Sequence, residues 1–163
     1  RFIDKESKRF FYKTASQARY FTAEWGDLLL VPDLVTISSL KTDRDGDRTY
    51  ETTWASTDYD LEPYAAVQDG EPYTRIRTAP NGRYSLSSAR RSIEITGERG
   101  WLTVPKLAKE ACLLLAIRLY KRKDAPFGVI GSAELGQLQV IARTDPDAKL
   151  LLDKIKRVDI GSM

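Results

Sequence analysis

The chain has 163 residues, enough for one domain with a hydrophobic core, and its 42% apolar and 30% charged residues are ordinary for a globular protein. Its 26 basic and 23 acidic residues give a net charge of +3, which is too balanced for charge alone to predict nucleic-acid binding. It contains no histidine, which excludes Ser-His and Cys-His nucleophile pairs and most zinc sites, and no run of 18 apolar residues that would predict a membrane span.

The N-terminal segment, residues 1–11, is predicted to be the end of a helix. Its apolar members Phe2, Ile3, Phe10 and Phe11 bracket a charged stretch. Because the chain starts abruptly inside this pattern, we expect this helix to be incomplete.

Short strands separated by turns are predicted from Tyr12 to about Thr96, where apolar and polar residues alternate. The Asp45-Gly46 step predicts a hairpin, and Pro32 is expected to end a strand. Gly97 and Gly100 predict a tight turn that closes the sheet and places Trp101 in the core. The expected strands lie at residues 19–22, 28–31, 34–40, 48–54, 73–77 and 92–96.

A long helix is predicted from Pro105 to about Lys123, because proline suits the first helical position and basic residues suit the last turn. Residues 111–117 are apolar for nearly two turns, which requires cover on every side. Two interpretations stay open: the helix is the core of one domain, or part of it packs against a neighbouring subunit. The single cysteine, Cys112, lies in this run and is expected to be buried as a small apolar residue.

The C-terminal region is predicted to be an apolar arm followed by a helix. Residues 124–144 show no sustained period, yet they are too apolar for a solvated linker, so we expect them to lie on a protein surface. The final helix is predicted to begin with Asp145 as its cap and Pro146 at its first position.

The order of these elements is helix, sheet, helix, arm and helix. It predicts an α+β fold with a central antiparallel β-sheet region flanked by helices, an extended C-terminal arm and a terminal helix. The expected division is a helix–sheet–helix domain at residues 1–123, and the arm with the terminal helix at residues 124–163.

Two acidic clusters are candidates for chemistry, and each has a plainer explanation. Residues 43–47 (Asp-Arg-Asp-Gly-Asp) resemble the start of a calcium loop, but Arg48 and Trp54 occupy the positions where an EF-hand needs glycine and glutamate, so a hairpin turn is favoured. Asp58 and Glu62, with Asp60 between them, would share a strand face as a glycosidase pair does. Charges that protect a strand edge explain them better.

A basic cluster lies between Tyr73 and Arg91. Its five arginines, interleaved with two tyrosines, could track a nucleic-acid backbone, although a solvated sheet face is the favoured interpretation. The arginines are Arg75, Arg77, Arg83, Arg90 and Arg91, and the tyrosines are Tyr73 and Tyr84. We predict no catalytic residue, no metal site and no cofactor, and we expect that the chain is not an enzyme.

Landmarks along nearly the whole chain, taken in their order and spacing, resemble the head–tail connector (adaptor) proteins of long-tailed bacteriophages. Members of that family usually have a further helix in front of the segment that starts at Arg1. The matching pieces are Ile3-Asp4, Phe10-Phe11, Arg19-Tyr20-Phe21, residues 35–40, the Asp45-Gly46 hairpin, residues 58–63, residues 93–97, Gly100-Trp101, Val104-Pro105, residues 125–129, Asp145-Pro146 and Leu151-Leu152.

The resemblance implies a structural virion protein at the head–tail junction, made in the host cytoplasm. Such proteins form a homo-oligomeric ring below the portal of the capsid, extend the DNA channel and offer a platform for a tail-side neck or stopper protein. Packaged DNA would pass through the channel without sequence-specific binding, and no membrane is involved.

The resemblance also implies that the C-terminal region reaches the portal. The expected portal interface consists of Pro126, Phe127, Gly128, Val129, Ile130, Leu135, Leu138, Val140, Ile141, Leu151 and Leu152. The expected contacts between subunits of the ring are Leu113, Leu114, Ile117 and Tyr120.

Two other classes of function stay open. A carbohydrate- or nucleic-acid-binding β module with flanking helices would use the exposed aromatic residues and the arginines between Arg75 and Arg91. A hydrolase that uses the carboxylates at residues 58–62 is the less favoured of the two.

Overall fold

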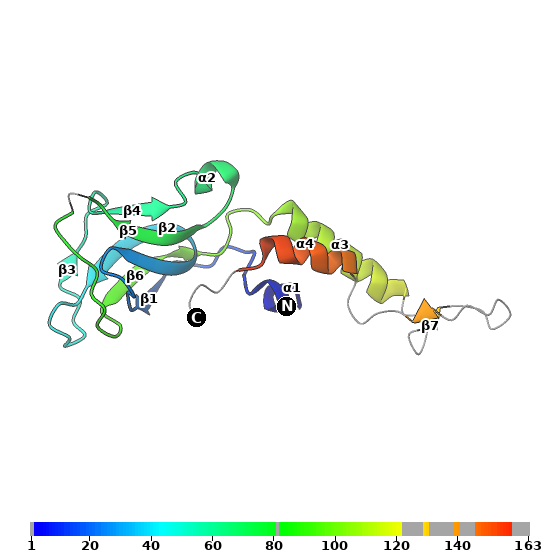
Figure 1. Ribbon diagram of the computed structural model, residues 1–163, viewed down its shortest axis with the longest axis horizontal. Coiled ribbons are helices and arrows are strands. Elements are labelled where there is room, and N and C mark those ends of the chain that lie inside the picture. The colour runs from blue at the N-terminus through cyan, green and yellow to red at the C-terminus, as the bar shows by residue number, and fades with distance from the viewer. Residues whose placement is uncertain (1, 81, 122–128, 131–138, 141–145, 158–163) are drawn as a thin grey trace. The chain divides into compact units, whose positions relative to one another are not determined.

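The computed structural model describes residues 2–80, 82–121, 129–130, 139–140 and 146–157 (Figure 1). The chain divides into two compact units: Phe10–Thr103 forms one, and Arg1–Arg9 together with Val104–Met163 forms the other. We call them the sheet unit and the helical unit. This division differs from the predicted boundary between residues 123 and 124, because the two long helices on either side of that boundary pack against each other.

The sheet unit contains a six-stranded antiparallel sheet, which together with the helices confirms the predicted α+β class. The strand order is β1-β6-β2-β5-β4, with β3 paired to β2, so β1 and β4 are the two edge strands. The strands are β1 (Gln17–Phe21), β2 (Leu28–Thr42), β3 (Thr52–Thr53), β4 (Tyr59–Glu62), β5 (Tyr73–Thr78) and β6 (Ile93–Arg99), and the short helix α2 (Ala66–Asp69) joins β4 to β5.

Strand β2 is one continuous strand where two were predicted, so the expectation that Pro32 ends a strand is wrong. Its first part pairs with β5 and its second part with β6, and Leu34 has a partner on both sides. The register shifts between Leu30 and Leu34. Proline is tolerated at such an irregularity, because the residue there need not donate a ladder hydrogen bond.

The core of the sheet unit consists of side chains from every strand except β3 and from the loops. Trp54 follows β3 directly and is buried, and its Nε1–H donates to Thr42 Oγ1 at 3.0 Å. A buried indole N–H is costly without a partner, so this bond fixes the ring in the core. The buried members are Ala23, Leu29, Val31, Leu34, Leu40, Trp54, Ile76, Leu86, Ile93 and Ile95.

The predicted turn at residues 97–100 is only partly correct. Gly97 lies within β6, where a Cβ would overlap the carbonyl oxygen of Thr36 on β2, so glycine allows the two strands to approach. The chain turns at Gly100, whose φ of 98° is a conformation that favours glycine. Trp101 is buried as predicted, with its ring centroid 5.7 Å from that of Phe11.

The predicted hairpin after β2 is present, because β3 pairs antiparallel with the end of β2. The second strand is only two residues long, whereas seven were expected. The loop between them, residues 43–51, is held by carboxylate caps: Asp43 accepts hydrogen bonds from the N–H groups of Gly46 at 2.7 Å and Arg48 at 2.8 Å. These side-chain bonds replace ladder bonds that a longer strand would have made.

The helical unit contains α1 (Phe2–Ser7), α3 (Lys106–Lys121) and α4 (Pro146–Ile155), and the strands β7 (Val129–Ile130) and β8 (Gln139–Val140) pair antiparallel. The predicted start of the last helix at Pro146 is confirmed. Helices α3 and α4 lie side by side (Figure 1) and bury small alanines, namely Ala108 and Ala111 on α3 and Ala148 on α4. Helix α1 packs against both, and the N–H of Arg157 donates to the carbonyl of Ser7 at 2.9 Å.

Candidate interaction surfaces

Helix α3 carries an exposed apolar stripe. Leu113, Ile117 and Tyr120 are 61%, 45% and 73% exposed, and their spacing of four and three residues places them on one face. The buried alanines of α3 lie on a different face. A helix with one apolar face buried and a second exposed is typical of a subunit that packs against another polypeptide.

The exposed stripe corresponds to the residues expected between subunits. Three of the four expected residues, Leu113, Ile117 and Tyr120, are exposed, and Leu114 is half-buried. The alternative in which α3 is a fully covered core helix does not agree with these exposures. The expectation that Cys112 is buried is wrong, since this cysteine is exposed.

The residues expected to reach a portal fall into three groups. Leu151 is half-buried, but Leu152 is 3% exposed and packs inside the helical unit, so Leu152 itself is corrected from a contact residue to a core residue. Val129, Ile130 and Val140 belong to β7 and β8. The others lie outside the described residues: Pro126, Phe127, Gly128, Leu135, Leu138 and Ile141.

Two of the three candidate carboxylates, Glu62 on the edge strand β4 and Asp58 just before it, make contacts within the sheet unit. Glu62 accepts from Arg77 Nε at 3.1 Å and lies 4.0 Å from Arg75, and Asp58 accepts from the backbone N–H of Ala55 at 2.8 Å. A glycosidase needs one carboxyl group to protonate a leaving group and another to act as base or nucleophile. Glu62 and Asp58 already accept charged or backbone donors, which favours a structural role for these two carboxylates.

The arginine cluster divides into two parts that the sequence did not distinguish. Arg75 and Arg77 lie on β5 and are paired with acidic residues; Arg77 also contacts Asp27 at 3.0 Å. Arg83, Arg90 and Arg91 lie in the loop between β5 and β6 and are exposed. Within the residues that the structure describes, these three arginines form no ion pair.

Tyr20, Tyr50 and Arg91 stack together at one end of the sheet unit. We call it the loop end, because it carries the 43–51 loop and the loop between β5 and β6. Tyr20 on β1 and Tyr50 on the 43–51 loop stack with ring centroids 5.3 Å apart, and the guanidinium of Arg91 lies 4.8 Å from the centroid of Tyr20. Tyr50 donates its hydroxyl proton to the carbonyl of Arg91 at 2.7 Å. Sequence reasoning missed this arrangement, because its members come from three separate segments.

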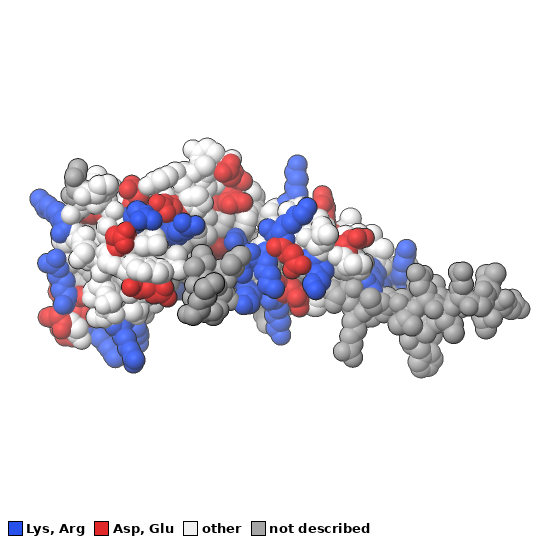
Figure 2. Space-filling view, viewed as in Figure 1, with Lys and Arg blue, Asp and Glu red and all other residues white. Residues whose placement is uncertain are grey.

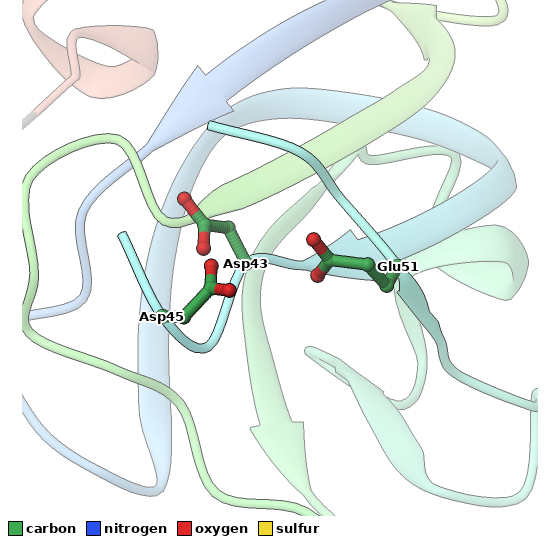
Figure 3. A group of neighbouring side chains, drawn as sticks. All are labelled: Asp43, Asp45 and Glu51. Atoms are coloured by element: carbon green, nitrogen blue, oxygen red, sulfur yellow. The ribbon is translucent and has the colours of Figure 1, made fainter. Parts of the chain in front are cut away.

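Asp43, Asp45 and Glu51 gather in the same loop (Figure 3). One carboxylate oxygen from each lies within 4.8 Å of the others, and of the three only Asp43 is buried. The calcium-loop pattern in the sequence contained Asp43 and Asp45 but not Glu51. In the fold, the loop places Glu51 beside these two aspartates. Both oxygens of Asp43 already accept backbone N–H bonds, so the arrangement is explained as the frame of a turn.

Hydrogen bonding from Gly46 is the largest influence on the Asp43 carboxyl group and lowers its pKa below the ordinary 3.8. A lowered folded-state pKa means that the ionised form stabilises the fold above pH 3.8, and that this contribution disappears as the pH falls through the folded-state value. We expect Asp43→Asn to lower the midpoint of thermal unfolding at pH 7 and to reduce the drop in that midpoint between pH 5 and acid. Circular dichroism melts across this range check the result, with Asp69→Asn as an exposed control; equal pH curves for wild type and Asp43→Asn would contradict it.

Arg99 is a buried arginine that joins β6 to the edge strand β1. Its guanidinium donates to the carbonyls of Gln17 at 3.2 Å and Ile95 at 3.3 Å, and it lies over the ring of Phe21. Burial, with a smaller contribution from Arg19, lowers the pKa of Arg99 to about 10. That value is still far above neutral, so the side chain remains charged and holds β1 in place through its carbonyl contacts.

No protein-family model matches the chain, and no curated protein gives a significant match. Among the described residues, none of the helices combines the length and apolar character needed to cross a membrane.

Proposed function

We propose that this chain is a head–tail connector of a long-tailed bacteriophage, a structural virion protein that assembles into a ring between the portal and the tail. The observation that carries the proposal is the exposed apolar stripe Leu113, Ile117 and Tyr120 on α3. The resemblance of the landmark residues to the adaptor family indicates which assembly the chain would form. The exposed stripe favours an assembly, because apolar side chains are stabilised when another polypeptide buries them. The partners on this proposal are further copies of the chain, a portal and a tail-side protein, and the location is the virion.

A ring requires each subunit to present two different surfaces, one to each neighbour. The stripe on α3 is one such surface. Burial of a large apolar side chain contributes about 1.5–3 kcal/mol, so three of them supply several kcal/mol to one contact. On this proposal the C-terminal region, including β7 and β8, contacts the portal, and no chemical step is involved.

The stripe is tested by the triple variant Leu113→Ser, Ile117→Ser and Tyr120→Ser. We expect assembly to weaken by at least about a hundredfold, since every 1.4 kcal/mol of lost contact energy is about a factor of ten. Light scattering after size-exclusion chromatography, with and without a portal, measures the mass of the assembly. Because these side chains are exposed, circular dichroism should show a folded protein.

The matched control is Val67→Ser with Leu102→Ser in the sheet unit, where both side chains are more than 60% exposed. This control should assemble like wild type. If the triple variant also assembled like wild type, the stripe would not be the subunit contact and the proposal would lose its structural support.

Cys112 offers a second readout on the same helix, because it is the only cysteine of the chain and is exposed. A maleimide polymer should label it in the dissociated subunit and label it much more slowly in the ring. Equal labelling rates in both states would place the contact elsewhere on the chain.

A further inference from the structure

We propose that the loop end of the sheet unit binds the phosphate backbone of double-stranded DNA through Arg44, Arg83, Arg90 and Arg91. The ring contact assigned to α3 does not use this surface. Figure 2 shows basic side chains projecting from the end of the sheet unit at the left of the view. The site would recognise charge and not sequence.

Arg91 is held in position before any ligand arrives. Its backbone adopts a φ of 58°, which is uncommon for a residue with a side chain. Its N–H donates to Thr22 Oγ1 at 2.9 Å, its carbonyl accepts from Tyr50, and its guanidinium lies against the ring of Tyr20. Three separate contacts therefore orient one exposed cation, and a pre-oriented guanidinium loses little freedom when it binds a phosphate.

The remaining arginines lie on the loops that meet around Arg91. The N–H of Asp43, next to Arg44, donates to the carbonyl of Ser92, next to Arg91, at 2.8 Å. The guanidinium of Arg44 also lies 5.5 Å from the ring centroid of Tyr84, the residue that follows Arg83. The four arginines thus belong to one surface, although up to 47 positions separate them in the sequence (91 − 44).

The three aspartates of the 43–51 loop accept hydrogen bonds that hold the loop. Asp43 accepts two backbone N–H bonds, Asp47 accepts one from Thr49 at 2.6 Å, and Asp45 accepts one from Asp47 at 3.3 Å. Their carboxylates accept hydrogen bonds from backbone N–H groups. The four arginines form no ion pair with a carboxylate among the described residues, so the guanidinium groups of Arg44, Arg83, Arg90 and Arg91 are available to a ligand.

A nucleic-acid backbone fits this surface better than an acidic peptide, because the arginines are spread over two loops and match a line of phosphates. A duplex fits better than a single strand. Single-strand sites offer free aromatic faces for bases, but Tyr20 stacks on Tyr50 and carries Arg91, and Tyr84 packs on Trp54 with ring centroids 5.3 Å apart. A duplex also presents phosphates at the higher density, about one charge per 1.7 Å of its axis.

The test is fluorescence anisotropy of a labelled mixed-sequence duplex titrated with the full chain between about 50 and 200 mM salt. The double variant Arg90→Ala with Arg91→Ala should bind roughly tenfold more weakly at low salt, and the slope of log affinity against log salt should fall by about 1.8, or 0.9 for each lost phosphate contact. The matched control is Arg75→Ala with Arg77→Ala, which removes the same charge from arginines that are already paired with Glu62 and Asp27. This control should keep the salt slope of wild type.

Three results would overturn the proposal. The first is no binding of the duplex by the wild-type chain, and the second is an equal loss of affinity in the two double variants. The third is competition by poly-glutamate as effective as that of DNA, which would assign the surface to an acidic protein segment. Light scattering on the same variants separates this proposal from the ring, because Arg90→Ala with Arg91→Ala should leave the assembled mass unchanged whether or not it binds DNA.

Discussion

Replacement of Gly97 by alanine is expected to destabilise the sheet unit by about 3 kcal/mol or more, equivalent to roughly 12 °C or more in Tm for a unit of this size. Gly97 lies in β6 opposite Ile37, next to a shift in the pairing with β2. A Cβ at this position would overlap the carbonyl oxygen of Thr36, which belongs to the backbone of a central strand. No side-chain rotation relieves such an overlap, so the two strands must move apart and weaken the central ladder.

Thermal and urea unfolding followed by circular dichroism measures this effect. Gly26→Ala is the matched control, because the nearest atom to a Cβ at Gly26 is the carbonyl oxygen of Leu86 at 3.9 Å, an ordinary contact distance. We expect the control to change the free energy of unfolding by less than about 1 kcal/mol. A Gly97→Ala protein as stable as Gly26→Ala would show that β2 and β6 do not approach as closely as described.

Leu34→Ala is expected to cost about 2–5 kcal/mol, the range for removing a fully buried leucine from a core. Leu34 is 0% exposed and lies where β2 changes its neighbours, pairing with Tyr73 of β5 on one side and Arg99 of β6 on the other. The cavity left by alanine would lie between three strands. Backbone pairing on both sides limits how far the chain can collapse into it, which favours the upper part of the range.

The control for Leu34→Ala is Leu102→Ala in the same unit, where the side chain is 67% exposed. Urea titrations should give the control a free energy of unfolding close to that of wild type. Equal losses in the two variants would mean that the position where β2 exchanges partners is not part of the core.

Periodicity predicted the class of the fold and most of its strands, because alternation of apolar and polar residues is a local signal. It failed where tertiary pairing overrides a local rule. Pro32 normally ends a strand, but the shift in register around it removes the need for its missing N–H. Gly97 was read as part of a turn, since the sequence does not reveal that the Thr36 carbonyl lies against it.

The candidate surfaces were predictable to different degrees. The stripe on α3 was anticipated as one of two open interpretations, because a helix that is apolar all round requires cover on every side. The Tyr20–Tyr50–Arg91 stack was not, since its members lie on β1 and on two loops that meet only after folding. Arg75 and Arg77 were grouped with Arg90 and Arg91 by sequence proximity alone, and their pairing with Glu62 separates them.

The sheet unit is a single continuous segment, whereas the helical unit is made of two segments that flank it in the chain. The entry and exit of this segment adjoin each other: the ring of Phe11 contacts that of Trp101, and Gly100 lies against the carbonyls of Phe10 and Tyr12. A segment whose two ends meet can be cut out and bridged, or exchanged for another, without stretching the protein that hosts it. The sheet unit is therefore an inserted segment, and we expect that it can be replaced or removed while the two flanking segments still form the helical unit.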